Sequence, residues 1–558
     1  MKKIFKFLIV AAFFTGFLSS CHKLDVKVTS ELTPDVFPTT PAQYASVIGP
    51  VYTAFRNSYA VDYWFLQSLS TDEAILPAYG SNWYDGNKYQ ELHRHTWTKD
   101  NAWVNSVWGY LENMVGTTNQ TIYIVRNSPD GPAKNASLAE LRTMRALSFF
   151  YLMDLYGNVP LDTAYGTATL NTNTPRAQIF SFVESELKAA IPDLNTASGA
   201  VTYGKPNRYT AFTILAKMYL NAEVYTGTPK YNECIAACDS VMNAGGGTEY
   251  ALEPMKTYLQ MFYPTNGPSM KEFIFAIPYD PATSAGYLFH ARYDLNRNLG
   301  IRYLYSGSTP GTNVDPIMNK TTGNGLVNNK PSGPRATLPE YYANFNDPND
   351  IRDKQWLTGP QYWQDGTPIM VSTTKAGYNQ FYTGSDGGTA YTYALTIDPN
   401  IVLRANPTLF DVGNDEIGWN MGTRNIKFLP DYTNTTSRNQ NNDVPVFRYS
   451  DIILMKAEAI LRGGTATMGQ TALSLFNMLR ENRTTSPDLT SVTLDDIYAE
   501  RCREFAWETW HRNDMIRFGK FEDSYGFKSN TDTYRRIFPI PTTALATNPK
   551  LVQNPGYN

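Results

Sequence analysis

Three glutamates near the end of the chain are spaced in a way that could support chemistry. Glu500, Glu504 and Glu508 recur at every fourth position, and residues with this spacing share one face of a helix. A pair of carboxyl groups can cleave a glycosidic bond, but the separation that this requires is spatial and cannot be judged from the sequence. Three acids on one face would also repel one another, so they need cations from elsewhere in the chain. Five arginines are candidates for this role: Arg448, Arg480, Arg503, Arg512 and Arg517. We interpret the set as a buried ion-paired network that clamps helices together, and not as a catalytic site.

A second group of residues combines aromatic rings with polar side chains. The segment between Asp72 and Trp97 is rich in Pro, Gly and Asn, which is typical of a loop. An exposed indole or phenol ring can stack on the apolar face of a sugar while Asp and Asn side chains bind the hydroxyls. The sequence therefore predicts a ligand-binding surface made of loop residues: Asp72, Asn82, Trp83, Tyr84, Asp85 and Trp97. The alternative is that these rings fill gaps between helix ends. Trp356, Trp363 and Trp419 are secondary candidates.

The chain begins with the pattern of a targeting segment. Three lysines precede an apolar run, Phe7 to Phe17, that is too short to span a bilayer as a permanent helix. The run ends in Leu-Ser-Ser-Cys21, the lipobox pattern of bacterial lipoproteins, in which the cysteine sulfur takes a diacylglycerol. Several acyl chains anchor a protein stably where one would not. We expect Cys21 to be the lipid attachment site and the mature N-terminus.

Composition and motifs argue against several other functions. The formal net charge is −3 and no basic patch emerges, so nucleic acid is a poor candidate partner. The signatures of serine hydrolases, zinc proteases and phosphate-binding loops do not occur in the sequence. His93 and His95 could bind a metal, but no third ligand is evident. We therefore expect no catalytic residues, no metal and no cofactor.

Helices are expected to supply most of the framework. Residues 448–462 are apolar on nearly every side, which is typical of a buried helix. A second helix should end near Arg480, and a third should begin at Thr493, where Asp496 completes a capping box. The largely apolar run at residues 272–279 predicts a short strand. Earlier helices are expected at 137–156, 175–190, 208–225 and 231–242, with small residues that allow the close packing of antiparallel pairs, as in tetratricopeptide repeats.

The chain resembles a known family over nearly all of its expected mature length, and the motifs that carry the resemblance are densest in its C-terminal part. Several motifs occur in order: Arg448-Tyr-Ser-Asp-Ile-Ile-Leu-Met-Lys-Ala-Glu-Ala459, Asn477-Met-Leu-Arg480, Glu500-Arg-Cys-Arg-Glu504-Phe, Asp514-Met-Ile-Arg517-Phe-Gly519, Phe538-Pro-Ile-Pro541 and Gln553-Asn-Pro-Gly-Tyr557. The series resembles the SusD/RagB family of outer-membrane nutrient-binding lipoproteins. Three positions depart from the pattern: Thr509 stands where the family usually has Gly, His511 where Arg is common, and a second arginine is displaced to Arg483.

The resemblance implies a fold and a role. The fold would be mainly α, with tetratricopeptide-like helical hairpins and an irregular insert of loops and short strands. The expected division is a signal peptide (1–20), an N-terminal helical part (21–270), the insert (271–442) and a C-terminal helical part (443–558) that packs with the rest. The protein would hold an oligosaccharide at the outer-membrane surface, without catalysis, and deliver it to a SusC-like TonB-dependent transporter. Peptide capture in the same kind of complex and surface glycoside hydrolysis are the alternatives.

Overall fold

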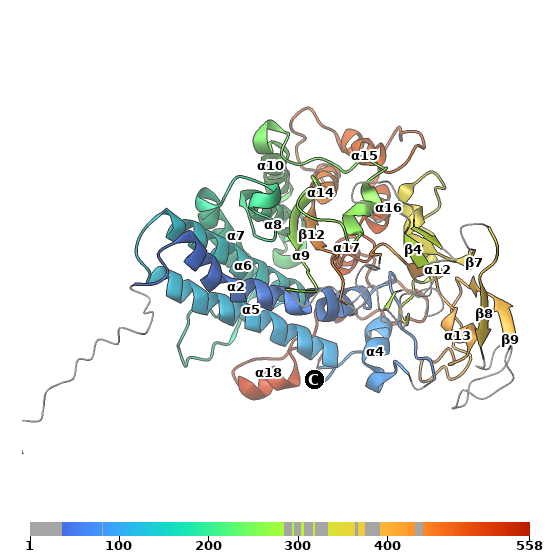
Figure 1. The fold of residues 1–558 in the computed structure, drawn as a ribbon. Helices are drawn as coiled ribbons and strands as arrows, with labels where there is room; N and C mark the ends of the chain where they lie inside the picture. The colour runs from blue at the N-terminus through green and yellow to red at the C-terminus, as the bar shows by residue number, and fades with distance from the viewer. Residues whose placement is uncertain are drawn as a thin grey trace, which may run out of the picture.

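The protein is mainly α-helical, with short pairs of strands gathered largely at one end (Figure 1). The computed structural model describes residues 36–80, 82–283, 293–294, 303–305, 316–318, 333–362, 366–373, 391–429 and 439–557. The leader and Cys21 lie outside these ranges. Within them, no helix combines the length and the apolar character needed to cross a membrane. The prediction of a mainly α fold is confirmed.

The N-terminal helices pack as antiparallel neighbours, α6 between α5 and α7, and α8 against α10. Their bounds are α2 Pro41–Ser58, α3 Trp64–Ser68, α4 Lys88–Arg94, α5 Ala102–Arg126, α6 Pro132–Tyr156, α7 Arg176–Ala190, α8 Arg208–Leu220, α9 Ala222–Thr226 and α10 Tyr231–Met242. Helix α6 begins at Pro132, earlier than the predicted start at Ser137. Proline favours the first helical position because its fixed φ matches the helix and its missing N–H is not needed there.

None of the later helices in the described residues exceeds the 13 residues of α14. They are α12 Pro339–Tyr342, α13 Glu416–Trp419, α14 Tyr449–Leu461, α15 Ala472–Arg480, α16 Leu494–Glu504, α17 His511–Arg517 and α18 Thr542–Thr547. A π-helical turn, η1 Tyr59–Tyr63, joins α2 to α3. The short 3₁₀ turns are η2 Asp85–Asn87, η3 Ile191–Asp193, η4 Gly199–Val201, η5 Ala244–Gly246, η6 Tyr258–Phe262, η7 Ile351–Gln355 and η8 Thr533–Arg536.

All the strand pairs in the described residues are antiparallel. They are β1 Val159–Pro160 with β2 Asn173–Thr174, β3 Phe273–Ile277 with β12 Val444–Arg448, β4 Tyr303–Tyr305 with β5 Pro316–Met318, β6 Trp356–Leu357 with β11 Arg424–Asn425, β7 Gly359–Pro360 with β10 Thr396–Ile397, and β8 Met370–Thr373 with β9 Tyr391–Ala394. The predicted strand at 272–279 is β3. Its pairing with β12 joins the N-terminal and C-terminal helices across the insert, and one hydrophobic core contains residues from Tyr44 to Tyr557.

The predicted third clamp helix is shorter than expected. Helix α16 has the predicted capping box between Thr493 and Asp496, but it ends at Glu504, and Glu508 lies in a bend before α17. Trp507 and Thr509 in this bend have φ of 62° and 69°, and positive φ cannot continue a right-handed helix. The expectation that Glu508 shares the helix face of Glu500 is therefore wrong. The positive φ at Thr509 is a conformation that glycine adopts at lower cost.

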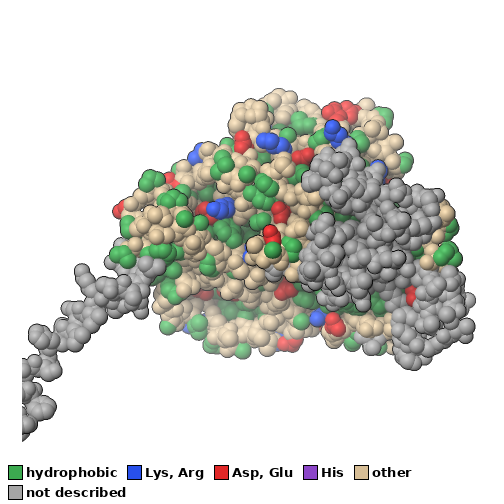
Figure 2. Space-filling view, viewed as in Figure 1, with side chains coloured by type: hydrophobic (Ala, Val, Ile, Leu, Met, Phe, Trp, Pro, Cys, Tyr) green, Lys and Arg blue, Asp and Glu red, His purple; other side chains and the backbone are tan. Residues whose placement is uncertain are grey.

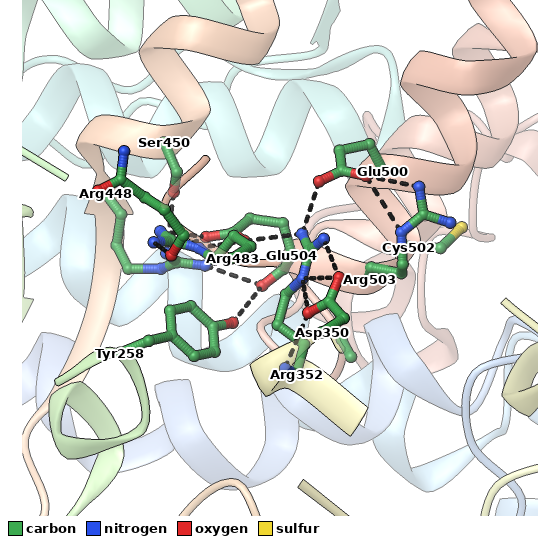
Figure 3. Close-up of polar contacts among 12 residues, drawn as sticks. Tyr258, Asp350, Arg352, Arg448, Ser450, Arg483, Glu500, Cys502, Arg503 and Glu504 are labelled. Carbon is green, nitrogen blue, oxygen red and sulfur yellow. Dashed lines mark hydrogen bonds and ion pairs between the residues drawn. The ribbon is translucent and has the colours of Figure 1, made fainter. Parts of the chain in front are cut away.

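The acids nonetheless form one buried network, shown in part in Figure 3. Glu504 lies at its centre and accepts hydrogen bonds from Arg352 (3.1 Å), Arg448 (2.7 Å) and Arg483 (2.9 Å). Glu500 pairs with Arg352 at 2.8 Å and with Arg503 at 2.5 Å. The network thus ties η7 of the insert, the end of β12 and the segment after α15 to helix α16.

Two further acids extend the network towards the other strand. Glu508 pairs with Lys427 at 2.5 Å and with Arg448 at 2.8 Å. Glu272, next to β3, pairs with Arg448 and Arg483. All these side chains are buried, so the interpretation of the glutamates as an architectural clamp is consistent with the structure.

The arginines that neutralise the acids are only partly those expected. Arg448 and Arg503 are members of the network, whereas Arg480, Arg512 and Arg517 are not. Arg512 donates to the carbonyl oxygens of residues 535 and 536, and Arg517 pairs with Glu458 and Asp514. Distance along the chain is a poor guide here because β-pairing and the insert bring Arg352 to the acids.

Replacing Glu504 should expose the cost of breaking the network. The variant Glu504→Ala strands three buried arginines, so we expect the unfolding free energy to fall by about 3–5 kcal/mol. Urea unfolding followed by tryptophan fluorescence measures this loss. The matched control is Asp495→Ala on the same helix, since Asp495 is 85% exposed and pairs with Lys520 at the surface; its loss should stay below about 1 kcal/mol. Equal, small losses for both variants would contradict the clamp.

Stability should also depend on pH through Glu500. Burial alone would raise the pKa of Glu500, but Arg352 and Arg503 outweigh burial and lower that pKa from 4.5 to about 2. Because the folded pKa is the lower one, the stabilisation is present above pH 4.5 and is lost as the pH falls towards 2. The shift corresponds to a contribution on the order of 3 kcal/mol. We expect the difference in unfolding free energy between wild type and Glu500→Gln to shrink over this range. A difference that stays constant on acidification would contradict this assignment.

Candidate ligand-binding surface

Four of the predicted ligand-binding residues lie together on one turn before helix α4. Tyr79 and Asn82 exchange backbone hydrogen bonds of 2.9 and 3.2 Å. The Asp411 carboxylate accepts from the backbone of Gly80 at 2.8 Å, and the Gln90 side chain donates to the carbonyl of Trp83 at 3.1 Å. The turn is therefore fastened at both ends to the protein body.

The backbone of this turn is strained. Trp83, Asp85 and Asn87 have φ of 62°, 45° and 71°. Positive φ is uncommon outside glycine, and for a bulky residue such as tryptophan it is an outlier. Strain of this kind costs of order 1–3 kcal/mol per residue, persists only where the surroundings enforce it, and is concentrated at ligand clamps and other functional sites.

The turn presents rings and polar groups together. Trp83 is half-buried, and its ring meets that of Tyr293 edge to face, with centroids 5.3 Å apart and planes at 88°. Asn82 and Asp85 are exposed, and Tyr84 is partly exposed. This combination of aromatic faces and hydrogen-bonding groups is the one that sugar recognition requires.

Tyr293 was not among the residues predicted from sequence, and Arg335 holds it in place. The backbone N–H of Arg335 donates to the carbonyl of Tyr293 at 3.2 Å, and its guanidinium pairs with Asp294. The same guanidinium lies over the ring of Trp64, 3.8 Å from its centroid. Tyr293 belongs to the irregular insert, where no periodicity in the sequence links it to Trp83.

Trp97 does not belong to this surface. Its side chain is only 1% exposed, its indole N–H donates to the hydroxyl of Tyr557 at 2.8 Å, and its ring packs against His95 and Phe538. The prediction of an exposed stacking ring is therefore wrong for Trp97. The loop composition around it was real, but the C-terminal tail returns over the ring and buries it.

Asp72 is also committed elsewhere. The Nε2 atom of His511 donates to its carboxylate at 2.6 Å, so the pair ties the loop after α3 to the start of α17. This contact gives Asp72 a structural partner, and its part in ligand binding stays a prediction. Of the secondary candidates, Trp356 and Trp419 are buried, and Trp363 lies outside the described residues.

His511 also contacts a thiol, which creates the order Cys–His–Asp. The Sγ atom of Cys502 lies 3.9 Å from Nδ1 of His511. Such an order can activate a nucleophile, but Cys502 is 2% exposed and burial raises the pKa of its thiol. Burial disfavours the imidazolium of His511, yet its contacts with Cys502 and Asp72 outweigh burial and raise its pKa well above the usual value. An enclosed thiol whose pKa is raised by burial is suited to packing and not to attack on a substrate.

His93 and His95, which were considered as metal ligands but not expected to bind one, lie at the end of helix α4. His95 Nε2 lies 2.9 Å from the carbonyl of Ser70, and burial lowers the pKa of His93 to about 4. Among the described residues, no group of three or more His, Cys, Asp or Glu side chains is arranged to hold a metal ion.

Comparison with known proteins places this architecture in a family. The chain is 23% identical over 516 residues to the starch-binding protein SusD of Bacteroides thetaiotaomicron, which covers 88% of this chain and 84% of that protein. A laminarin-binding SusD-like protein has a structure that matches 92% of this chain and 99% of its own, with a TM-score of 0.67 and 19% identity. Surface glycan-binding protein A from Bacteroides uniformis matches 92% of this chain and 99% of its own, with a TM-score of 0.66 and 17% identity.

At these identities the solved structures establish the shared fold. The family assignment comes from the sequence model of the SusD family, which matches residues 213–557, more than half of the chain. That match includes α14 to α17 and the buried acid–arginine network. The chain belongs to the SusD family.

Proposed function

We propose that this protein is a non-catalytic glycan-binding lipoprotein of the outer membrane. The observation that carries the proposal is the strained turn at Trp83, where a half-buried indole meets Tyr293 edge to face beside the exposed side chains of Asn82 and Asp85. A preformed ring with neighbouring hydrogen-bonding groups binds a sugar without a deep pocket or chemical change.

The distribution of acidic groups supports a binding role over an enzymatic one. Glycoside hydrolysis needs two carboxyl groups that face a substrate. The densest acids of this chain, Glu500, Glu504 and Glu508, are buried and paired with cations. The names of the related proteins point the same way, since one is starch-binding, another is laminarin-binding and a third is a surface glycan-binding protein.

The cellular setting rests on the sequence and the family. The Leu-Ser-Ser-Cys21 pattern supports lipid attachment at Cys21, and membership of the SusD family supports an outer-membrane location facing the medium. The same membership supports a SusC-like TonB-dependent transporter as the partner that receives the ligand. On the face shown in Figure 2, the described acidic and basic side chains are scattered among polar and apolar ones, which suits an uncharged ligand better than nucleic acid.

Peptide capture is the second candidate. The combination of exposed Asn82 and Asp85 with Trp83 could also hold a peptide, because amide groups use the same kinds of hydrogen bond as hydroxyls. The relatives whose names refer to starch, laminarin and glycans favour the glycan.

Removing the Trp83 ring should weaken binding without unfolding the protein. We expect Trp83→Ala to lower affinity for laminari- or malto-oligosaccharides by about tenfold, the loss of ~1.4 kcal/mol expected for one aromatic contact. Isothermal titration calorimetry measures the affinity, and thermal melting measures the stability. The matched control is Tyr123→Ala, which removes an exposed ring (50%) on α5 and should leave affinity unchanged. Trp97→Ala should instead destabilise the fold by about 3–5 kcal/mol. Equal affinities for wild type and Trp83→Ala would remove the turn from the site.

Binding should occur without turnover. When the purified protein is incubated with a glycan that it binds, we expect no reducing ends to accumulate over hours, because the densest acids, Glu500, Glu504 and Glu508, are buried in ion pairs. A steady release of reducing ends by the native wild-type protein, with none after heat denaturation, would instead favour a surface glycoside hydrolase. A peptide library that displaces the bound glycan fully would favour peptide capture.

A further inference from the structure

A small cavity lies in the insert, apart from the Trp83 turn. It has a volume of about 170 Å³ and is formed where the β9–β10 segment faces helix α13. Its lining residues are Tyr393, Ala394, Thr396, Asp398, Glu416, Ile417 and Asn420. Sites for drug-sized ligands measure roughly 300–1,000 Å³, so this cavity has room for a single small unit such as one sugar ring.

The floor of the cavity is formed by three polar side chains that are hydrogen-bonded to one another. The Tyr393 hydroxyl donates to the Glu416 carboxylate at 2.9 Å and accepts from the Asn420 side chain at 3.1 Å. These three side chains are between 4% and 7% exposed. Burying polar groups costs free energy unless they are paired, and this chain of bonds holds them in fixed positions at the base of an open cavity.

The walls of the cavity combine apolar and polar residues. Ile417 and Ala394 supply apolar surface, while Thr396 and Asp398 are polar and Asp398 is exposed at the rim. Apolar walls with a few fixed polar groups are the usual construction of a small-molecule site. A sugar ring has the matching surfaces, because its C–H faces suit the walls and its hydroxyls can donate to Glu416 and accept from Asn420.

The charge of the lining restricts the ligand. The described residues that line the cavity include two acids, Asp398 and Glu416, and no basic side chain. A carboxylate or sulfate on the ligand would meet like charge in a partly desolvated site, which is unfavourable. The carboxylates of Asp398 and Glu416 therefore favour a neutral sugar unit over an anionic one.

The cavity and the Trp83 turn flank the same small hydrophobic cluster. Tyr79, Val412, Trp419 and Met421 form this cluster, and both Trp83 and Ile417 pack against it. Its centre is rigid, because the rings of Tyr79 and Trp419 stack with centroids 4.0 Å apart and planes at 11°. Helix α13 contributes Trp419 to the cluster and Glu416 to the cavity, so one element fixes the position of the cavity relative to the turn.

We propose that the cavity is a second subsite, which takes one neutral sugar unit of a glycan whose neighbouring part contacts the Trp83 turn. The proposal rests on the proposed glycan-binding function and makes it more specific. It assigns ligand length and charge selectivity to Glu416, Asn420 and Tyr393, and the first contact with the glycan to Trp83.

The test compares short and long probes on variants that block or neutralise the cavity. The probes are laminari- and malto-oligosaccharides, as disaccharides and as chains of six or more units, with affinities measured by calorimetry. Thr396→Trp places a large ring at the cavity, and Val552→Trp is its matched control because Val552 is 67% exposed on the C-terminal tail. We expect Thr396→Trp to weaken binding of the long chains at least about fivefold, in line with the loss of one or two hydrogen bonds, and to leave disaccharide binding and the control unchanged.

Charge selectivity provides an independent readout. Wild type should bind long chains oxidised to carboxylates at C6 more weakly than the neutral chains, and Glu416→Gln should reduce that discrimination. Unchanged binding of long chains by Thr396→Trp, together with weaker binding by Trp83→Ala, would overturn the subsite and leave the proposed function standing. Failure of wild type to bind any of these probes would overturn both.

Discussion

The buried carboxylate of Glu504 is the interaction on which the rest of the structure depends. Three arginines from separate parts of the chain, Arg352, Arg448 and Arg483, converge on it. Each charge would be costly to bury alone, and the attraction between them offsets that cost only when all partners are present and well oriented. The network therefore makes the insert, strand β12 and the C-terminal helices depend on one another, and it explains why a large irregular segment can have defined anchor points.

This architecture determines where recognition can occur. Because Glu500, Glu504 and Glu508 are buried in ion pairs within the framework, the groups proposed to bind ligand lie elsewhere, on the Trp83 turn and around the cavity beside α13. The Trp83 turn is held by Asp411 and by the stack of Tyr79 on Trp419, and Arg335 fixes the segment that carries Tyr293. A ligand would meet positions that are already set, which lowers the entropy cost of binding. The strained backbone at Trp83 is sustained by the same contacts.

The sequence predicted this framework better than it predicted the site. Helical periodicity, the cap at Thr493 and the unusual run of glutamates each reflect local physics, and each was found. The bend after Glu504 was missed because four-residue spacing continues through it, although Thr509 in a position that favours glycine was a hint. Arg352 was not predicted as a partner of the acids, because only long-range packing brings it to them. The segments around Trp97 and Trp83 have the same loop-like composition. Trp97 lies in the core and Trp83 near the surface because the C-terminal tail places Tyr557 against the indole of Trp97. The division of the chain into parts stays a prediction.

Amide hydrogen exchange with and without a bound neutral oligosaccharide tests the central claim most directly. We expect ligand to slow exchange in residues 79–90 and in the 393–420 region, while helices α14, α16 and α17 exchange equally slowly in both states because their network is closed to solvent. Ligand-induced changes concentrated in residues 494–517, with none in the Trp83 turn, would show that the buried acids take part in recognition and would contradict that claim.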